Sequence, residues 1–168
     1  MRLLVNTAEL GRITGTAKEL VGDVEPADVG IDDDRLVPGA PIHIDLNLES
    51  VNDGVLVTGT VAATWAGECR RCLEPAGDTA VAVIDERYQY VVTDPDAFPI
   101  EHDQLDLVPL VREAVLLELP DAPLCRPDCA GLCPTCGTNL NTGSCDCVAV
   151  PTDARWGALD DLKRQLEG

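Results

Sequence analysis

The chain has 168 residues, 45% of them hydrophobic, which suits one folded domain with an apolar core and excludes a wholly disordered segment. Twelve Lys and Arg residues against 30 Asp and Glu residues give a formal net charge of −18, which disfavours broad contact with nucleic acid phosphates or anionic membranes and favours basic partners. Aromatic residues make up only 3%, so the core must be built mainly from aliphatic side chains.

The first forty residues give mixed patterns. Residues 2–5 suit a short strand, residues 7–20 are ambiguous because Gly11 and Gly15 interrupt a helical spacing, and the acidic residues 23–39 suggest a solvated loop. Met1–Val5 is followed at once by Asn6, so no targeting segment is expected, and the apolar runs are too short for a membrane span. We expect a soluble, cytoplasmic protein with no membrane partner. In a reducing compartment its cysteines would be thiolates; a secreted disulfide framework is the alternative.

Alternating residues then predict three strands. Between residues 41 and 66 two alternating runs flank Asn52-Asp53-Gly54, where glycine suits a positive backbone angle, so this stretch is predicted to be an antiparallel hairpin. It leads directly into Cys69, which a strand end would hold firmly. Residues 78–92 alternate again and predict a third long strand, followed by a loop over residues 93–103.

Two helices are predicted in the second half. Residues 107–119 combine Asp106 as an N-cap with a wide apolar face that runs from Leu107 to Leu117, so this helix should be largely buried. A last helix should begin after Asp153, with Trp156 on its apolar side. The predicted class is α+β: an antiparallel β-rich body with a buried helix, a cysteine-rich zinc module and a C-terminal helix. We expect a single domain over residues 1–168, with the body over about 1–104 and the helix and zinc module over about 105–168.

The cysteines predict the most specific chemistry. Closely spaced thiolates supply a tetrahedral metal site two corners at a time, and Cys-Pro-Thr-Cys-Gly at residues 133–137 is typical of a zinc knuckle. Judged by which cysteines lie near enough along the chain to share a metal ion, the last four would form one local Cys₄ site and the first four would form another. The alternative is one site made from the first pair and two later cysteines. The predicted ligands of one or two zinc ions are Cys69, Cys72, Cys125, Cys129, Cys133, Cys136, Cys145 and Cys147.

A metal bound entirely by sulfur is structural rather than catalytic, because a catalytic zinc keeps an open position. His43 and His102 are both far from the cysteine pairs in sequence, and no nucleotide-binding or nucleophile motif is present. We therefore expect no enzyme and no small-molecule substrate. Arg70, Arg71 and Arg126 adjoin proposed ligands and are expected either to donate hydrogen bonds to sulfur or to be ordinary surface charges.

The order and spacing of these motifs over roughly residues 41–168 resemble the YceD family of large ribosomal RNA subunit accumulation proteins. The residues that carry the resemblance are Cys69-Arg-Arg-Cys72-Leu73-Glu74-Pro75, Asp106-Leu107, Leu119-Pro120, Cys125, Asp128-Cys129-Ala-Gly-Leu-Cys133-Pro-Thr-Cys136-Gly-Thr-Asn139-Leu140-Asn141, Cys145-Asp146-Cys147 and Asp153-Ala-Arg155-Trp156.

The resemblance implies a non-enzymatic role in ribosome biogenesis, in which large-subunit rRNA accumulates. In bacteria the family's gene often neighbours that of a small, basic, zinc-binding protein of the large subunit. With the charge of −18, this suggests that the chain chaperones a basic ribosomal protein or binds the pre-large-subunit particle, with any rRNA contact confined to a local basic spot. Three alternatives stay open: a direct rRNA-binding zinc protein, a redox-regulated zinc holdase, and a metal-dependent hydrolase.

Overall fold

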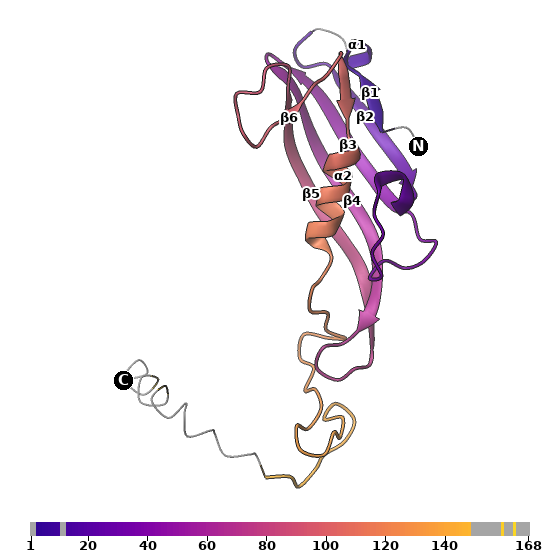
Figure 1. Cartoon of the computed structure of the whole chain (residues 1–168), viewed down its shortest axis with the longest axis vertical. Coiled ribbons are helices and arrows are strands. Elements are labelled where there is room, and N and C mark those ends of the chain that lie inside the picture. The colour runs from indigo at the N-terminus through magenta and orange to yellow at the C-terminus, as the bar shows by residue number, and fades with distance from the viewer. Residues whose placement is uncertain (1–2, 11–12, 149–158, 160–162, 164–168) are drawn as a thin grey trace.

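The computed structural model describes residues 3–10, 13–148, 159 and 163, and it is built around one twisted sheet with a cysteine-rich extension at one end (Figure 1). The predicted α+β class with antiparallel strands is confirmed. The main sheet has the order β2-β3-β4-β5-β6, with antiparallel neighbours except for β5 and β6. Its strands are β2 (Ala17–Val24), β3 (Ile42–Val51), β4 (Gly54–Glu68), β5 (Pro75–Gln89) and β6 (Phe98–Pro99). A second small sheet pairs β1 (Leu4–Asn6) with β7 (Gln104–Asp106), and the helices are α1 (Thr7–Leu10), the 3₁₀ helix η1 (Pro26–Val29) and α2 (Val108–Glu118).

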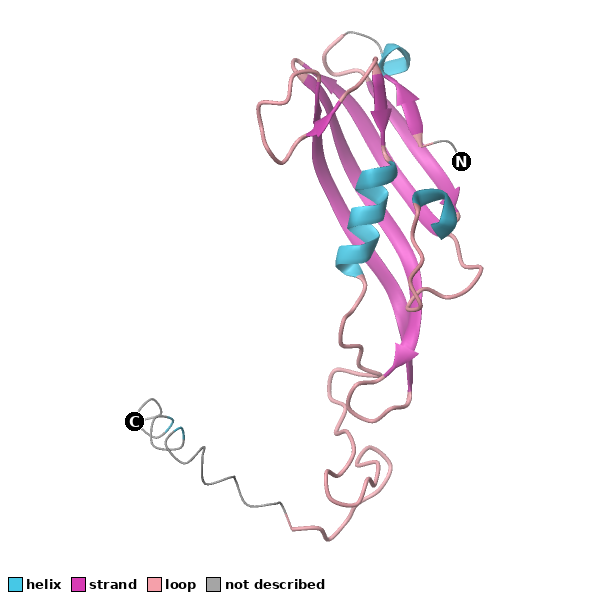
Figure 2. Cartoon of the chain, viewed as in Figure 1, coloured by secondary structure: helices cyan, strands magenta, loops and turns pink. Residues whose placement is uncertain are grey.

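One face of the main sheet is buried, and α2 lies across it (Figure 2). The strands alternate because successive side chains point to opposite faces, so Ile42, Ile44, Leu46 and Leu48 of β3 are all buried. Leu110, Val111 and Val115 of α2 complete the same core. The core is almost entirely aliphatic, and Tyr88 is the one fully buried aromatic side chain among the residues that the structure describes.

The predicted hairpin is confirmed, with one change at its turn. β3 and β4 pair from Ile42 with Ala63 to Val51 with Gly54, which leaves Asn52 and Asp53 as the connection. Gly54 does not have the positive φ that was expected of it. It is a strand residue, and a Cβ there would lie 1.8 Å from the carbonyl oxygen of Tyr88, so close packing rather than turn geometry requires glycine.

The N-terminal half contains more structure than its sequence suggested. Residues 17–24 form β2, which pairs with β3 over its whole length, although this stretch was ambiguous. The prediction of a solvated loop over residues 23–39 is wrong in part, because Val24, Val29 and Ile31 are buried in the core. Acidic residues alternate there with a few apolar ones, and burying those few is enough to order the segment. The region predicted as the loop over residues 93–103 contains β6.

The helix predicted over residues 107–119 is observed one residue shorter at each end. Leu107, not Asp106, is the N-cap, but the Asp106 carboxylate still accepts a hydrogen bond from the Val108 amide at 2.9 Å. The apolar face is narrower than predicted, since the Leu117 side chain is 78% exposed. None of the helices among the described residues is both long enough and apolar enough to span a membrane.

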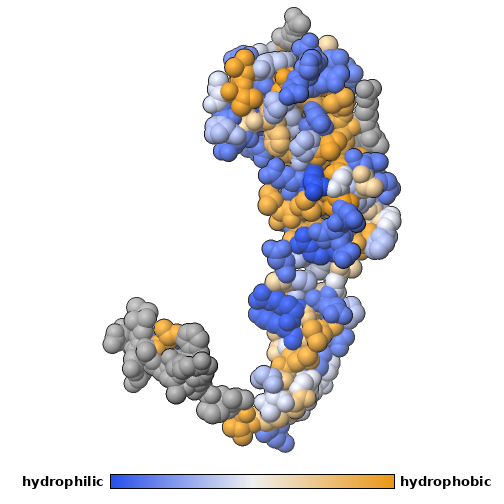
Figure 3. All heavy atoms as spheres, in the orientation of Figure 1, coloured by the Kyte–Doolittle hydropathy of each residue, from blue (hydrophilic) through white to orange (hydrophobic). Residues whose placement is uncertain are grey.

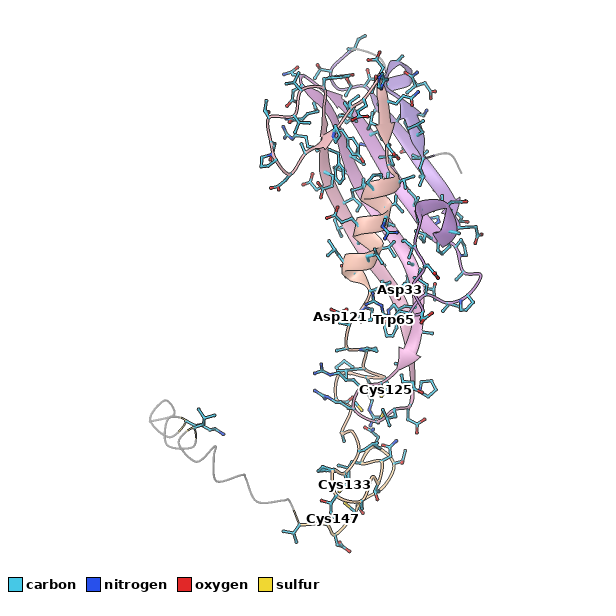
Figure 4. All side chains as sticks on the ribbon, in the orientation of Figure 1. Asp33, Trp65, Asp121, Cys125, Cys133 and Cys147 are labelled. Atoms are coloured by element: carbon cyan, nitrogen blue, oxygen red, sulfur yellow. The ribbon has the colours of Figure 1, made fainter. Side chains whose placement is uncertain are left out.

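The cysteine-rich extension is packed separately from the sheet core. Cys69, Cys72, Ala76 and Cys129 form their own small buried cluster at the end of β4 and β5, with Trp65, Leu124 and Leu132 packed against it. In Figure 4 Cys125 lies close to this end of the sheet, and Cys133 and Cys147 lie farther along the extension. The predicted helix after Asp153 falls outside the described residues, apart from Leu159 and Lys163.

Candidate metal centres

The first group of four cysteines joins two distant parts of the chain. Cys69 and Cys72 lie in the connection between β4 and β5, and Cys125 and Cys129 follow α2. Three of the four side chains are buried and Cys125 is exposed. The expectation that the first pair sits at a strand end is confirmed, because β4 ends at Glu68.

The second group is local. Cys133, Cys136, Cys145 and Cys147 come together within the extension; Cys133 is buried, Cys136 and Cys147 are exposed, and Cys145 is intermediate. The sulfurs therefore follow the partition expected from reach, with two complete groups, rather than one group plus leftover cysteines.

The geometry of both groups suits a tetrahedral ion better than disulfides. Within each group the four Sγ atoms all lie within 4.8 Å of one another. In the first group the Cys69 and Cys129 sulfurs are 3.7 Å apart, and those of Cys72 and Cys125 are 3.6 Å apart. Four sulfurs each about 2.3 Å from a central zinc would be about 3.8 Å from one another, whereas a disulfide needs about 2.05 Å. All eight cysteines are free.

The two Cys-x-x-Cys turns have the same backbone hydrogen bonds. In the first, the Leu73 amide donates to the Cys69 carbonyl at 2.8 Å, and in the second the Gly137 amide donates to the Cys133 carbonyl at 2.9 Å. The next residue closes each turn, because the carbonyl of Glu74 accepts from the Cys69 amide. Thr138 does the same for Cys133 in the second turn at 2.9 Å. Both turns are therefore knuckles that aim two sulfurs at one point.

The first knuckle has an unusual residue at its key position. Gly137 of the second knuckle has φ +74°, and the equivalent Leu73 has φ +63°, a left-handed conformation that costs a leucine about 1–2 kcal/mol. The Leu73 side chain is exposed, so core packing does not repay this cost. The rest of the knuckle must hold it in place.

The pKa values of the thiols diverge within each group. In the first, burial raises the pKa of Cys69, but amide hydrogen bonds from Cys125, Arg71 and Cys72 outweigh it and bring that pKa to about 6. Burial and the neighbouring sulfurs of Cys72 and Cys129 raise the pKa of Cys125 to about 12.

The second group repeats this divergence. The side-chain hydroxyl and backbone amide of Thr138 lower the pKa of Cys136 to about 6, while Cys136 and burial raise the pKa of Cys147 to about 12. Four crowded thiols cannot all ionise without a cation, so each group is chemically suited to bind one.

Asn141 is the residue next to the sulfurs that sequence reasoning missed. Its amide nitrogen Nδ2 donates to the Cys129 sulfur at 3.3 Å, and its Oδ1 accepts from the Ala130 amide and from Arg126, both at 2.8 Å. This contact also lowers the pKa of Cys129, against the opposing effect of burial. The Asn139-Leu140-Asn141 run after the second knuckle was the only sequence signal for it.

The arginines do not donate to sulfur, contrary to one of the two expectations. Arg71 donates to the Cys129 carbonyl at 3.0 Å, and Arg126 bonds to Asn141 and to Asp128. No side-chain hydrogen bond or ion pair of Arg70 is found among the described residues, and its backbone amide donates to the Pro123 carbonyl at 2.9 Å. The Arg70 and Arg71 contacts tie the extension to the first knuckle through backbone carbonyls.

Glycine makes one of these backbone contacts possible. Gly131 has φ +77°, and a Cβ there would lie 3.1 Å from the carbonyl oxygen of Arg71. That carbonyl accepts from the Leu132 amide at 3.0 Å, which fixes the second group relative to the first. Neither histidine belongs to a group; His43 Nδ1 lies instead 2.8 Å from a carboxylate oxygen of Asp23.

The fold and the site define a class: an antiparallel sheet that carries two four-cysteine metal-type centres at one end. The profile described as "Large ribosomal RNA subunit accumulation protein YceD" matches residues 57–163, so the chain belongs to the YceD family, as the sequence motifs suggested.

Similar chains occur in mycobacteria and plants. An uncharacterized protein of Mycobacterium tuberculosis is 40% identical over 146 residues, which cover 82% of this chain and 70% of that protein. One of Mycobacterium leprae is 39% identical over 137 residues, or 74% of this chain and 60% of that protein. "Large ribosomal RNA subunit accumulation protein YCED homolog 1, chloroplastic" of Arabidopsis thaliana is 36% identical over 70 residues, or 42% of this chain and 22% of that protein. No solved structure matches the chain significantly.

Proposed function

We propose that this protein is a non-enzymatic, cytoplasmic factor in large-subunit ribosome assembly, and that it chaperones a basic ribosomal protein until that protein joins the subunit. The coarse part, a role in the accumulation of large-subunit rRNA, is supported by the family and by the name of the plant relative. The finer part depends on one observation, the formal charge of −18. Such a surface repels rRNA and attracts a cationic client.

Zinc has a structural part in this proposal. Zinc is expected at both centres, bound by Cys69, Cys72, Cys125 and Cys129 in one and by Cys133, Cys136, Cys145 and Cys147 in the other. With sulfur at all four positions, neither centre leaves a place for a substrate or a reactive water. Each occupied centre carries a formal charge of −2, which adds to the acidity of the protein.

The test combines a pull-down with a metal measurement. Tagged protein would be recovered from growing cells, its partners identified and its zinc content measured on the same sample. We expect a basic large-subunit protein, two zinc ions per chain, and client binding that weakens with salt. Binding of purified rRNA with a steep salt dependence would favour the direct rRNA-binding alternative. Zinc loss and a gain in client binding after peroxide treatment would favour the redox holdase. Unchanged large-subunit precursors after depletion would refute the assembly role.

A further inference from the structure

The outer edge of β5 is unpaired over most of its length. β5 contacts β6 only through Tyr88 and Gln89, and among the described residues no strand or backbone hydrogen bond covers residues 76–87 on that side. Sheet proteins normally protect such an edge with charges, proline or a covering segment. Here residues 79–84, Thr-Ala-Val-Ala-Val-Ile, are uncharged and contain no proline.

A groove lies beside this edge. It has a volume of about 550 Å³ and runs between β5, the loop that leads into β6, and α2. Ala82, Ile84 and Leu110 supply apolar surface, and the exposed Leu117 forms part of its wall. Figure 3 shows this face of the molecule, where hydrophobic residues are visible between hydrophilic ones.

Four carboxylates line the same groove: Glu86, Asp96, Glu113 and Glu118. None of them forms an ion pair with another described residue. Partial burial, and then the negative charges of Glu113, Asp85 and Asp96, raise the pKa of Glu86 above its usual value. The groove thus concentrates negative charge that the described chain does not neutralise.

The nearest basic side chain on α2 is already used elsewhere. Arg112, the only basic residue of α2, donates to the Gly30 carbonyl just past η1. Within the described part of the chain no basic side chain neutralises these carboxylates, so the groove suits a cation supplied by another molecule.

We propose that an extended segment of the basic partner binds here, adding a strand to the free edge of β5, with its apolar side chains against the groove and its basic side chains at the four carboxylates. The inference rests on the proposed function for the partner's basic character, and it adds the surface and the binding mode. Edge addition provides affinity through backbone hydrogen bonds, and the groove provides selectivity.

A second copy of this chain is a poor occupant of the same edge. Two β5 edges brought together would juxtapose the carboxylates of both grooves, and each chain carries a formal charge of −18. Like charges that are brought close together repel each other and disfavour association. The same acids that attract a basic strand therefore act against self-pairing.

The probe for this proposal is a synthetic nine-residue peptide of alternating Lys and Val, capped at both ends. Its control has the same length and charge, with proline in place of two valines, because proline cannot pair in the middle of a strand. With zinc-loaded full-length protein, we expect binding of the first peptide and slower hydrogen exchange of those amides in residues 79–84 that face the free edge, by about tenfold at saturation. The control peptide should give neither effect.

Two charge-matched variants locate the binding site. One replaces three groove acids (Glu86→Gln, Glu113→Gln, Glu118→Gln), and the other replaces three acids remote from it (Glu19→Gln, Glu25→Gln, Glu49→Gln). Removal of three attractive contacts should raise the Kd for the peptide by about tenfold in the groove variant, whereas the remote variant should change the Kd by less than about twofold. Circular dichroism would verify that both fold.

Several results would overturn the inference. One is that both variants weaken peptide binding equally. Another is that the peptide slows hydrogen exchange in residues 17–24 of β2 instead of residues 79–84. A third is that exchange in residues 79–84 slows with rising protein concentration alone, which would mean self-pairing. Absence of peptide binding also refutes it. If a basic ribosomal protein then still binds with unprotected residues 79–84, the proposed function survives and only this surface is wrong; if no basic protein binds, both fail.

Discussion

Replacement of Asn141 by Ala should weaken zinc binding at the first centre and leave the second centre nearly unchanged. Apart from the cysteine thiols themselves, the Asn141 amide is the only side-chain donor to a sulfur of the first group among the described residues. Its Nδ2 lies 3.3 Å from the Cys129 sulfur, which would be a thiolate with zinc bound. Alanine removes this donor and also leaves the Ala130 amide without its acceptor.

The magnitude follows from the charge on the acceptor. A hydrogen bond to a charged group contributes about 1.5–3 kcal/mol, against about 1 kcal/mol for a neutral pair. Each 1.4 kcal/mol is tenfold in affinity, so the zinc Kd of the first centre should rise by roughly 10–100-fold, which is also the usual range for residues that orient metal ligands.

The assay is competition for zinc with a chromogenic chelator at neutral pH, with two release phases followed separately. The matched control is Thr138→Val, because the Thr138 hydroxyl lies 3.1 Å from the Cys136 sulfur in the second group. Thr138→Val should weaken the second centre and spare the first. Asn141→Asp keeps the Oδ1 acceptor but sets a carboxylate against the thiolate, so it should be worse than Asn141→Ala at the first centre.

Two outcomes would refute the reasoning. One is an Asn141→Ala protein whose first centre releases zinc as the wild type does. The other is equal weakening of both centres by each variant, which would mean that the extension responds as a whole and that no side chain belongs to one centre.

Three further predictions follow from the structure. Leu73→Gly in the first knuckle should stabilise the zinc-loaded protein by about 0.5–1 kcal/mol, and Gly137→Ala in the second should destabilise it by about 1 kcal/mol, because φ is positive at both positions. Equal changes in Tm of the same sign would contradict this prediction. The pKa of Glu86 is raised in the folded state, so the charged carboxylate destabilises the protein above that folded pKa and has no effect below the unfolded pKa of about 4. Glu86→Gln should therefore be more stable than the wild type by about 0.5 kcal/mol at pH 7 and equally stable at pH 3. A stability difference that persists at pH 3 would exclude a charge effect. Removal of zinc by a chelator should abolish hydrogen-exchange protection in residues 69–76 while residues 42–63 stay protected, since the two buried clusters are separate; simultaneous loss of both would show one cooperative unit.

The sequence predicted the sheet best where one face alone is buried. β3 alternates throughout and β4 and β5 alternate in their central parts, so the hairpin and the third strand could be predicted within a few residues. β2 could not, because it lies at the sheet edge, where most of its residues are at least partly exposed and its pattern is weak. Its position is decided by pairing with β3, a long-range contact that no local pattern encodes.

The metal centres show the same division between local and distant information. Spacing along the chain located both cysteine pairs and identified the second as a knuckle, and reach was enough to predict which sulfurs come together. Leu73 and Gly137 hold equivalent positions in the two Cys-x-x-Cys motifs, and the φ angles of the structure show what that position requires. The role of Asn141 depends on a loop that folds back over Cys129, so it required the structure.

We propose that metal stabilises one end of the protein and not the other, because the two buried clusters are separate. Among the described residues the sheet core contains 25 buried hydrophobic residues, whereas the cluster at the first centre contains Ala76 and three cysteines. So little apolar surface cannot order the backbone around it, while structural zinc contributes on the order of 10–16 kcal/mol. The groove beside β5 lies on the sheet body, and its apolar lining residues Ala82, Ile84 and Leu110 belong to the larger core. Loss of zinc and loss of the partner surface should therefore be separable, and a partner that contacts both parts would sense whether the metal is bound.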